Sequence, residues 1–245
     1  MIGIIKSEFY RIRHTSLIWI HLIVPVLYTL MYLFLAKTTG LRNYPKDDII
    51  KTFLVLLSAA FPIIIGAITA KVSDLEMKAG GFKVILSETK SRKKAYISKL
   101  IVLLIGGFFS TIIAICLFAL LFQNQSMIDY LVEALLIFVG TIGIYIINLW
   151  VSIAIGPGAS IGLGFVGALL AGLSLTGLFD SIWYYIPYTW PSRLSLTYII
   201  GNDLNRILTK EEFIKWAIIA IPVIIVLLIL SLMWFKKRDG KAYTD

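Results

Sequence analysis

Six long runs of apolar residues limit what this chain can fold into. Each run is long enough to cross a membrane, since about 20 residues of α-helix span a hydrocarbon core of about 30 Å. The runs occupy residues 17–36, 53–70, 100–122, 130–155, 159–179 and 214–235. The hydrophobic content of 59% exceeds the roughly 45–50% of soluble domains. The sequence therefore predicts one all-α, polytopic membrane domain over residues 1–245, with six transmembrane helices.

The distribution of Lys and Arg predicts how these helices are oriented. The polar segment 71–99 carries eight basic residues against three acidic ones, and short loops rich in Lys and Arg stay on the cytoplasmic side. Both termini are then cytoplasmic. Three basic residues in the amino-terminal segment, eight in this loop and four in the tail place 15 of the 23 inside, although loop 37–51 outside carries four. This topology, with attraction to anionic lipid, accounts for the net charge of +9 without nucleic acid.

Residues 1–16 are predicted to form an interfacial helix that precedes the first span. Apolar residues recur there at helical spacing among basic ones, at Ile2, Ile5, Phe9 and Ile12. Such a helix lies flat at the lipid headgroups with its basic face toward the cytoplasm. The alternative is an ordinary basic flank of the first span.

The cytoplasmic segment 71–99 has signals of local structure. Ser73 and Glu76 have the spacing of a capping box, which predicts that a short helix begins there. Gly80 and Gly81 are expected to end or bend it. An apolar patch follows at Phe82, Val84, Ile85 and Leu86. Exposed apolar residues on a cytoplasmic helix indicate docking to another protein; the alternative is a solvated basic hairpin that only sets the topology.

Small residues recur every four positions in the fifth run, residues 159–179. They are Ser160, Gly164, Ala168, Gly172 and Thr176. Small residues at this spacing allow two helix backbones to approach closely in lipid. The neighbour is either another span of the same chain or a span of a second chain, and the spacing alone leaves both open.

Aromatic residues are dense in segment 180–213, the longest segment predicted outside. They are Trp183, Tyr184, Tyr185, Tyr188 and Trp190. Aromatic residues at this density commonly lie at the membrane interface, and anchoring there is the simpler interpretation. The second interpretation is a lid or capture surface for an amphipathic substrate.

Several kinds of chemistry have no motif in this chain. There is no Gly-x-x-x-x-Gly-Lys-Ser/Thr sequence, so no ATP site is expected. His14 and His21 lack the further ligands of a metal site, and the single Cys116 cannot form an internal disulfide. Asn148 is the one clearly central polar residue, and it is expected to face another helix. The lack of central acids or bases weakens the reading of a secondary transporter or channel.

The segment 71–99 resembles the first cytoplasmic loop of type-2 ABC exporter permeases. The matching positions are Gly80-x-Phe82-x-x-Ile85-Leu86-x-x-x-x-Ser91-Arg92, followed by Lys99. Thr89 stands where that family usually has Pro. The resemblance implies a coupling helix that sits in a groove of a separate ATPase subunit. The residues implied to contact the ATPase are Leu75, Glu76, Gly80, Phe82, Ile85, Leu86, Ser91 and Arg92.

The resemblance also implies the other partners. ATP and Mg would be bound by the ATPase, in two copies, so this chain is expected to need no cofactor and to be no enzyme itself. A second permease, identical or related, would complete the path across a bacterial cell membrane. The family places the second and fifth spans near the seam between permeases, so the implied interface residues are Ser160, Gly164, Ala168, Gly172 and Thr176.

Within this family, the chain looks most like the lantibiotic-immunity permeases. The similarities are its size, the aromatic segment 183–193 and the departure at Thr89. Those pumps remove antimicrobial peptides from the membrane of the producing cell, which implies an amphipathic peptide as substrate. The candidate lid residues are Trp183, Tyr184, Tyr185, Tyr188 and Trp190. Export of drugs, lipids or polysaccharide is the alternative within the family, and a secondary transporter or membrane scaffold is the alternative outside it.

Overall fold

The computed structural model describes residues 2–13, 15–78, 92–203 and 206–237, and these ranges contain helices but no strand. The long helices are α1 (Ile2–Arg13), α2 (Ser16–Thr38), α3 (Lys46–Lys78), α5 (Arg92–Phe122), α6 (Met127–Ala154), α7 (Pro157–Leu173), α8 (Trp190–Asp203) and α9 (Arg206–Lys237). Short 3₁₀ helices are η1 (Gly40–Asn43), η2 (Gly177–Phe179), η3 (Trp183–Tyr185) and η4 (Pro187–Thr189). The all-helical prediction is confirmed for the described residues.

Five of these helices, all but α1, α7 and α8, are long and apolar enough to cross a membrane. The predicted spans 17–36, 53–70, 100–122, 130–155 and 214–235 lie within or nearly within them. The fifth predicted span, 159–179, extends six residues beyond the helix, because α7 ends at Leu173 after 17 residues. At about 1.5 Å per residue α7 is about 26 Å long, slightly less than a hydrocarbon core.

Local sequence signals explain several helix boundaries. The Thr15 hydroxyl accepts the Leu17 backbone N–H at 3.3 Å and caps α2. Ser126 caps α6 in the same way, through the backbone N–H of Asp129 at 3.1 Å. The turn before α7 has Gly156 at φ +137°, where a side chain would be strained.

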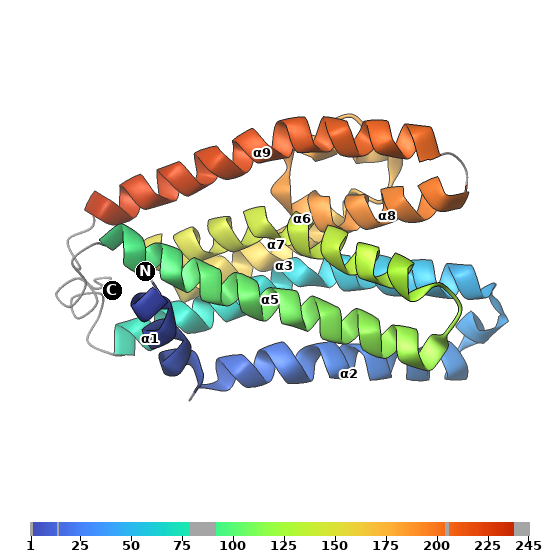
Figure 1. Cartoon of the computed structure of the whole chain (residues 1–245), viewed down its shortest axis with the longest axis horizontal. Helices are drawn as coiled ribbons and strands as arrows, with labels where there is room; N and C mark the ends of the chain where they lie inside the picture. The colour runs from blue at the N-terminus through green and yellow to red at the C-terminus, as the bar shows by residue number, and fades with distance from the viewer. Residues whose placement is uncertain (1, 14, 79–91, 204–205, 238–245) are drawn as a thin grey trace.

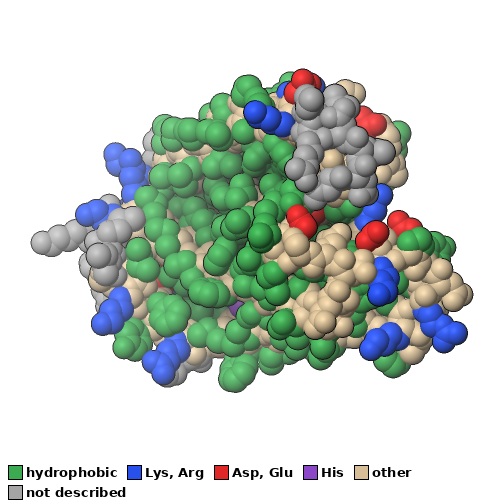
Figure 2. Space-filling view, turned by 45° about the vertical axis from the view of Figure 1, so that its right-hand side comes forward, with side chains coloured by type: hydrophobic (Ala, Val, Ile, Leu, Met, Phe, Trp, Pro, Cys, Tyr) green, Lys and Arg blue, Asp and Glu red, His purple; other side chains and the backbone are tan. Residues whose placement is uncertain are grey.

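Apart from α1, which crosses one end, the long helices lie side by side along the long axis of the molecule (Figure 1). The last turns of α3, the first turns of α5 and the last turns of α9 gather at the end of the bundle that carries α1. We call this the α1 end. The links from α2 to α3 and from α5 to α6 lie at the opposite end, as do the last turn of α8 and the first turn of α9. Figure 2 shows a broad hydrophobic surface on the body of the molecule, with charged side chains toward its margins.

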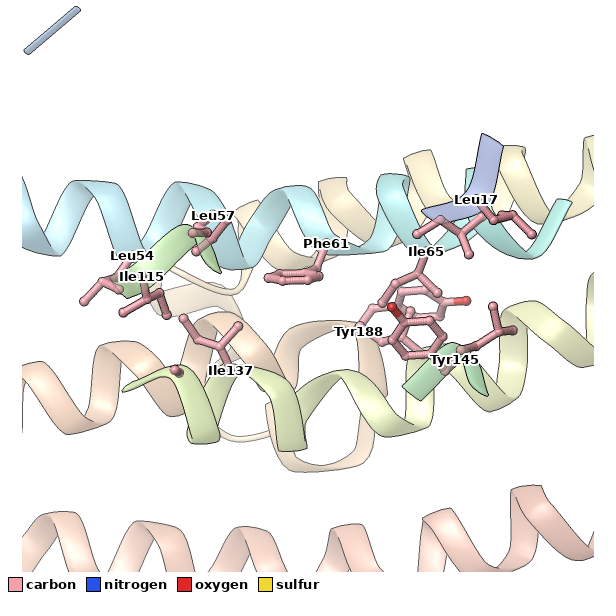
Figure 3. Packing of buried hydrophobic residues seen from close by; sticks show 14 of the residues in the cluster. Leu17, Leu54, Leu57, Phe61, Ile65, Ile115, Ile137, Tyr145 and Tyr188 are labelled. Atoms are coloured by element: carbon pink, nitrogen blue, oxygen red, sulfur yellow. The ribbon is translucent and has the colours of Figure 1, made fainter. Parts of the chain in front are cut away.

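The core is organised around α3. Within the span windows, 61% of the α3 residues are buried, against 17% for α9, so α3 is the central helix and α9 the most peripheral. Figure 3 shows Phe61 and Ile65 of α3 between this helix and the one that carries Ile137 and Tyr145. Hydroxyl groups also join helices: Tyr32 of α2 donates to the Ile49 carbonyl of α3 at 2.7 Å.

Helices α3 and α7 approach each other closely at two glycines. A Cβ atom on Gly66 would lie 2.6 Å from the Ser160 carbonyl oxygen, and one on Gly164 would lie 2.7 Å from the Pro62 carbonyl oxygen. Real Cβ atoms do not reach such distances, so these positions require glycine for the backbones to meet. Part of the small-residue face of α7 is therefore used within the chain.

The aromatic segment folds back into the bundle after α7. Gly140 and Gly143 lie near the middle of α6, and Cβ atoms on them would come within 2.7 Å of the Pro191 backbone nitrogen and 3.1 Å of the Pro187 Cβ. Helix α8 then runs along α6 toward the opposite end. The prediction of a segment lying wholly outside the spans is wrong for residues 187–191, because these pack against the centre of a span.

Candidate functional site

A cluster of four charged side chains, three of them buried, joins three helices at the α1 end. Glu8 and Arg11 come from α1, Glu76 from the last turns of α3, and Lys99 from the third turn of α5. Lys99 is 1% exposed, Glu76 2% and Glu8 6%. These three form the most strongly charged buried group in the described part of the chain, and the partly exposed Arg11 brings the sum of the formal charges to zero.

Lys99 is the centre of the cluster. Its Nζ donates to both carboxylate oxygens of Glu8 at 2.9 Å and also to Oε1 of Glu76. Arg11 donates to the same Glu76 oxygen, and its Nη1 lies 3.6 Å from Glu8 Oε1. Each carboxylate therefore meets both cations. Because buried charges are stable only when paired, this arrangement fixes the three helices relative to one another.

Local sequence explains how the partners reach the cluster. In α1, Ile5, Glu8 and Ile12 fall on one helix face by spacings of three and four residues, so Glu8 occupies the face that packs inward. That spacing is the signal that reveals Glu8: an acidic residue on an otherwise apolar face. The sequence gives no comparable signal that Glu76 and Lys99 meet, because they are 23 positions apart and depend on how α3 and α5 pack.

The cluster sits at the two helix ends that flank segment 79–91. Helix α3 ends at Lys78 and α5 begins at Arg92, and the cluster residues lie within three turns of these ends. Any force applied to the intervening segment therefore acts on helices that Lys99 and Glu76 hold to α1. Glu76 Oε2 is buried and has no hydrogen-bond partner among the described residues.

The predicted ATPase-contact residues are divided by the structure. Leu75 is half-buried against the core, Glu76 belongs to the ion cluster, and the Arg92 Nη1 donates to the Lys236 carbonyl of α9 at 3.1 Å. The other predicted contacts lie outside the described residues: Gly80, Phe82, Ile85, Leu86 and Ser91. Glu76 is thus enclosed by this chain and does not present its carboxylate on the surface.

The capping box expected at Ser73 and Glu76 is wrong. Helix α3 continues without interruption from Lys46 to Lys78, so no helix begins at Ser73. The Ser73 hydroxyl donates to the Ser152 carbonyl of α6 at 3.0 Å, and Glu76 bonds Lys99. Tertiary partners on other helices take both side chains that a local cap would have used.

The predicted permease-interface residues also separate into two groups. Ser160 and Gly164 are buried against α3, which favours the interpretation of packing within the chain for these two. Ala168 and Gly172 are partly exposed, and Thr176 is exposed. A Cβ atom on Gly172 would meet nothing within 4 Å. The outer part of this stripe remains available for a second chain.

A polar network surrounds Ser160 and confirms that Asn148 faces other helices. The Asn148 Nδ2 donates to the Tyr188 hydroxyl at 3.0 Å, and the Ser160 hydroxyl lies 3.2 Å from Asn148 Oδ1. Thr69 of α3 is 2.7 Å from the Ser160 hydroxyl, and Ser152 donates to the Thr69 carbonyl at 2.9 Å. The network joins α3, α6, α7 and η4 in the interior.

The aromatic side chains predicted as an anchor or lid are mostly internal. Trp190 is fully buried, and Trp183 and Tyr188 are nearly so. The Trp190 indole donates to the Tyr184 carbonyl at 2.9 Å, which fixes the turn. Burial, followed by the hydrogen bond to Glu212, raises the pKa of Tyr184 to about 12, so this hydroxyl stays protonated at neutral pH. Only Tyr185, 62% exposed, offers an aromatic surface.

The buried aromatic and charged groups, the spanning helices and the apolar surface together define a polytopic membrane protein. Residues 4–190 match the sequence model of the ABC-2 family transporter proteins. This match covers more than half of the 245 residues, and the chain belongs to the ABC-2 transporter family. No curated protein and no solved structure matches the chain. Membership identifies a membrane component that works with an ABC ATPase.

Proposed function

We propose that the chain is the permease subunit of an ATP-driven exporter and that its α1 end faces the cytoplasm of a bacterial cell. The ion cluster carries this proposal, because it joins α1 to the two helices that flank segment 79–91. The excess of Lys and Arg in segment 71–99 supports the orientation, with both termini inside. In the complete assembly α7 serves as the sixth span.

In this proposal, the ATPase docks on segment 79–91 and not on Glu76. The apolar residues Phe82, Ile85 and Leu86 supply the anchor, and Gly80, Ser91 and Arg92 complete the contact. Glu76 and Lys99 act as positioning residues, because they hold α3 and α5 to α1 when the ATPase moves the segment. Displacing one helix alone would leave a buried charge unpaired, which is costly, so the three helices move together.

The proposed substrate is a lantibiotic or another amphipathic antimicrobial peptide, removed from the membrane to protect the cell. The loop sequence around Thr89 and the aromatic segment support this choice, through their resemblance to immunity permeases. The assembly would contain two ATPase copies and a second permease that meets the outer stripe of Ala168, Gly172 and Thr176. ATP and Mg would be bound only in the ATPase.

A docking experiment tests this proposal. The tagged chain is expressed with its ATPase and second permease, and three quantities are measured: co-purified ATPase, permease abundance, and survival under a pore-forming peptide. Phe82→Asp should abolish ATPase capture and survival at unchanged abundance, because an apolar anchor contributes about 2 kcal/mol or more, about 30-fold in affinity. Ser87→Asp in the same segment is the matched control and should retain both.

The outcomes separate the alternatives. Full ATPase capture with Phe82→Asp would contradict the docking role of the segment. If the unmodified chain captures no ATPase, a non-transport membrane scaffold is the better description. If the complete pump assembles but protects against no membrane-active peptide, the peptide substrate is wrong. Export of drugs, lipids or polysaccharide then becomes the function to test.

A further inference from the structure

Glu133 is a buried acidic residue that the ion cluster does not include. It lies in the second turn of α6, at the opposite end from α1, and is 1% exposed. Both of its carboxylate oxygens are buried and lack a hydrogen-bond partner in the part of the chain that the structure describes. An isolated carboxylate is unfavourable in such surroundings, and intramembrane acidic residues commonly mark ligand sites.

Helix α8 carries two buried serines in this region, and one of them, Ser195, lies beside the Glu133 carboxyl group. The Ser195 hydroxyl lies next to Glu133 without forming a hydrogen bond of ordinary geometry. Ser192 lies one turn earlier on the same face of α8. Both serines are fully buried, and their hydroxyl oxygens also lack partners among the described residues. Glu133 and Ser195 thus bring three buried oxygen atoms together between α6 and α8, and Ser192 adds a fourth buried oxygen one turn along α8.

A cavity lies about one turn of α6 away from Glu133, which is not among its lining residues. Asp129 lies one turn before Glu133 on the same face of α6 and lines a cavity of about 540 Å³ between α6, α8 and α9. The Tyr198 hydroxyl donates to Asp129 Oδ1 at 2.9 Å and the Ser126 hydroxyl to Oδ2 at 2.7 Å, so Asp129 is already bonded. Lys210 is exposed and also lines the cavity. Glu133, whose carboxylate has no partner among the described residues, is more deeply buried than Asp129.

We propose that Glu133, Ser192 and Ser195 bind one small monovalent cation, which enters past Asp129. Carboxylate and hydroxyl oxygens suit hard cations. One carboxylate balances one positive charge, whereas a divalent ion would leave an excess charge in apolar surroundings. The shared chemistry is a compact positive centre, supplied either by an alkali-metal ion or by a primary ammonium group. The site does not depend on the transporter assignment.

Cation-dependent stability tests the site. The purified full-length chain in lipid nanodiscs is heated in NaCl, KCl or methylammonium chloride, with N-methylglucamine chloride as the bulky control at equal ionic strength. Tryptophan emission gives the unfolding midpoint, since Trp216 of α9 packs against Trp190 of α8 beside the site. A bound cation should raise the midpoint, and stability should keep rising with the logarithm of concentration above Kd.

Two variants make the result specific. Glu133→Gln should fold with a midpoint close to that of the unmodified chain in N-methylglucamine chloride, because a buried carboxyl group without a bound cation is neutral and the amide has nearly the same shape. Glu133→Gln should also need at least a tenfold higher cation concentration for the same rise in the unfolding midpoint. Glu211→Gln changes an exposed carboxylate on α9 and should leave the response unchanged.

The cation that works identifies the source of the charge. A response to sodium or potassium but not methylammonium assigns an alkali-metal site, and the reverse assigns a site for an amine. No response to any of the three cations would overturn the proposal. An equal response in Glu133→Gln would overturn it as well, because the cation would then be acting elsewhere.

Discussion

Replacing Lys99 with methionine should destabilise the chain far more than replacing a surface lysine. The Lys99→Met change removes the donor to both Glu8 oxygens and to Glu76, and leaves two buried carboxylates with Arg11 alone. Breaking a buried ion pair costs about 3–5 kcal/mol. The Arg11 side chain is 38% exposed and still approaches both carboxylates, so we expect the lower end, about 3 kcal/mol. This corresponds to roughly a hundredfold change in the folded-to-unfolded ratio.

A matched control uses an exposed ion-paired lysine near the same end. The Lys78 Nζ lies 3.0 Å from Asp74, but its side chain is 72% exposed, so Lys78→Met should cost no more than about 0.5 kcal/mol. Unfolding of the purified chain in mild detergent micelles by added SDS, followed by tryptophan emission, gives both values.

A double-mutant cycle shows whether the charges act as one cluster. Adding Glu8→Gln to Lys99→Met leaves Arg11 and Glu76 as a neutral pair, so the combined cost should fall below the sum of the single costs. Coupling of about 0.5–3 kcal/mol is expected for residues in one network. If the losses of stability are additive, or if the two lysine variants have equal midpoints, the cluster does not hold the three helices together as one network.

Two further predictions concern packing and orientation. Gly164→Leu should lower stability by about 1–3 kcal/mol or more, because its Cβ atom would lie 2.7 Å from the Pro62 carbonyl oxygen. Gly172→Leu should stay within about 0.5 kcal/mol but reduce cross-linking between permeases; equal SDS midpoints for the two variants would contradict this packing. Single cysteines at Lys93 and Gln125, in a background without the native cysteine, should be labelled from the cytoplasm and from outside respectively. Labelling of the Lys93→Cys chain by an impermeant reagent in intact cells would invert the proposed topology.

The sequence predicts the helices well because the apolar runs are long and continuous. It also predicts that Asn148 faces other helices, since a central amide is costly in lipid. The failures occur where tertiary partners compete with local signals. Ser73 and Glu76 have the spacing of a cap, yet Ser152 and Lys99 take their side chains.

Two of the buried acidic residues, Glu8 and Glu133, show how much of a site can be predicted from sequence. Glu8 can be identified from its place on an apolar helix face, although its partner cannot. Glu133 lies inside a predicted span, but near its outer end, where an acid is easily taken for a headgroup contact. Only the return of α8 along α6 places Ser195 beside it and makes it internal. The sequence does not predict that α8 packs along α6, because the composition of the aromatic segment is typical of an exposed membrane interface.

The distribution of buried polar bonds indicates which parts can move separately. Thr69 and Ser160 bond each other across α3 and α7. Between α3 and α6, the Ser73 hydroxyl donates to the Ser152 carbonyl and the Ser152 hydroxyl to the Thr69 carbonyl. Sliding α3 along either neighbour would leave these buried groups without partners, at about 1–3 kcal/mol each. Helices α3, α6 and α7 therefore behave as one body. The ion cluster adds α1 and α5 to that body at one end, so force on segment 79–91 moves the body as a whole. Helix α9 is the least buried of the candidate spans, so a motion of this body relative to α9 costs the least free energy.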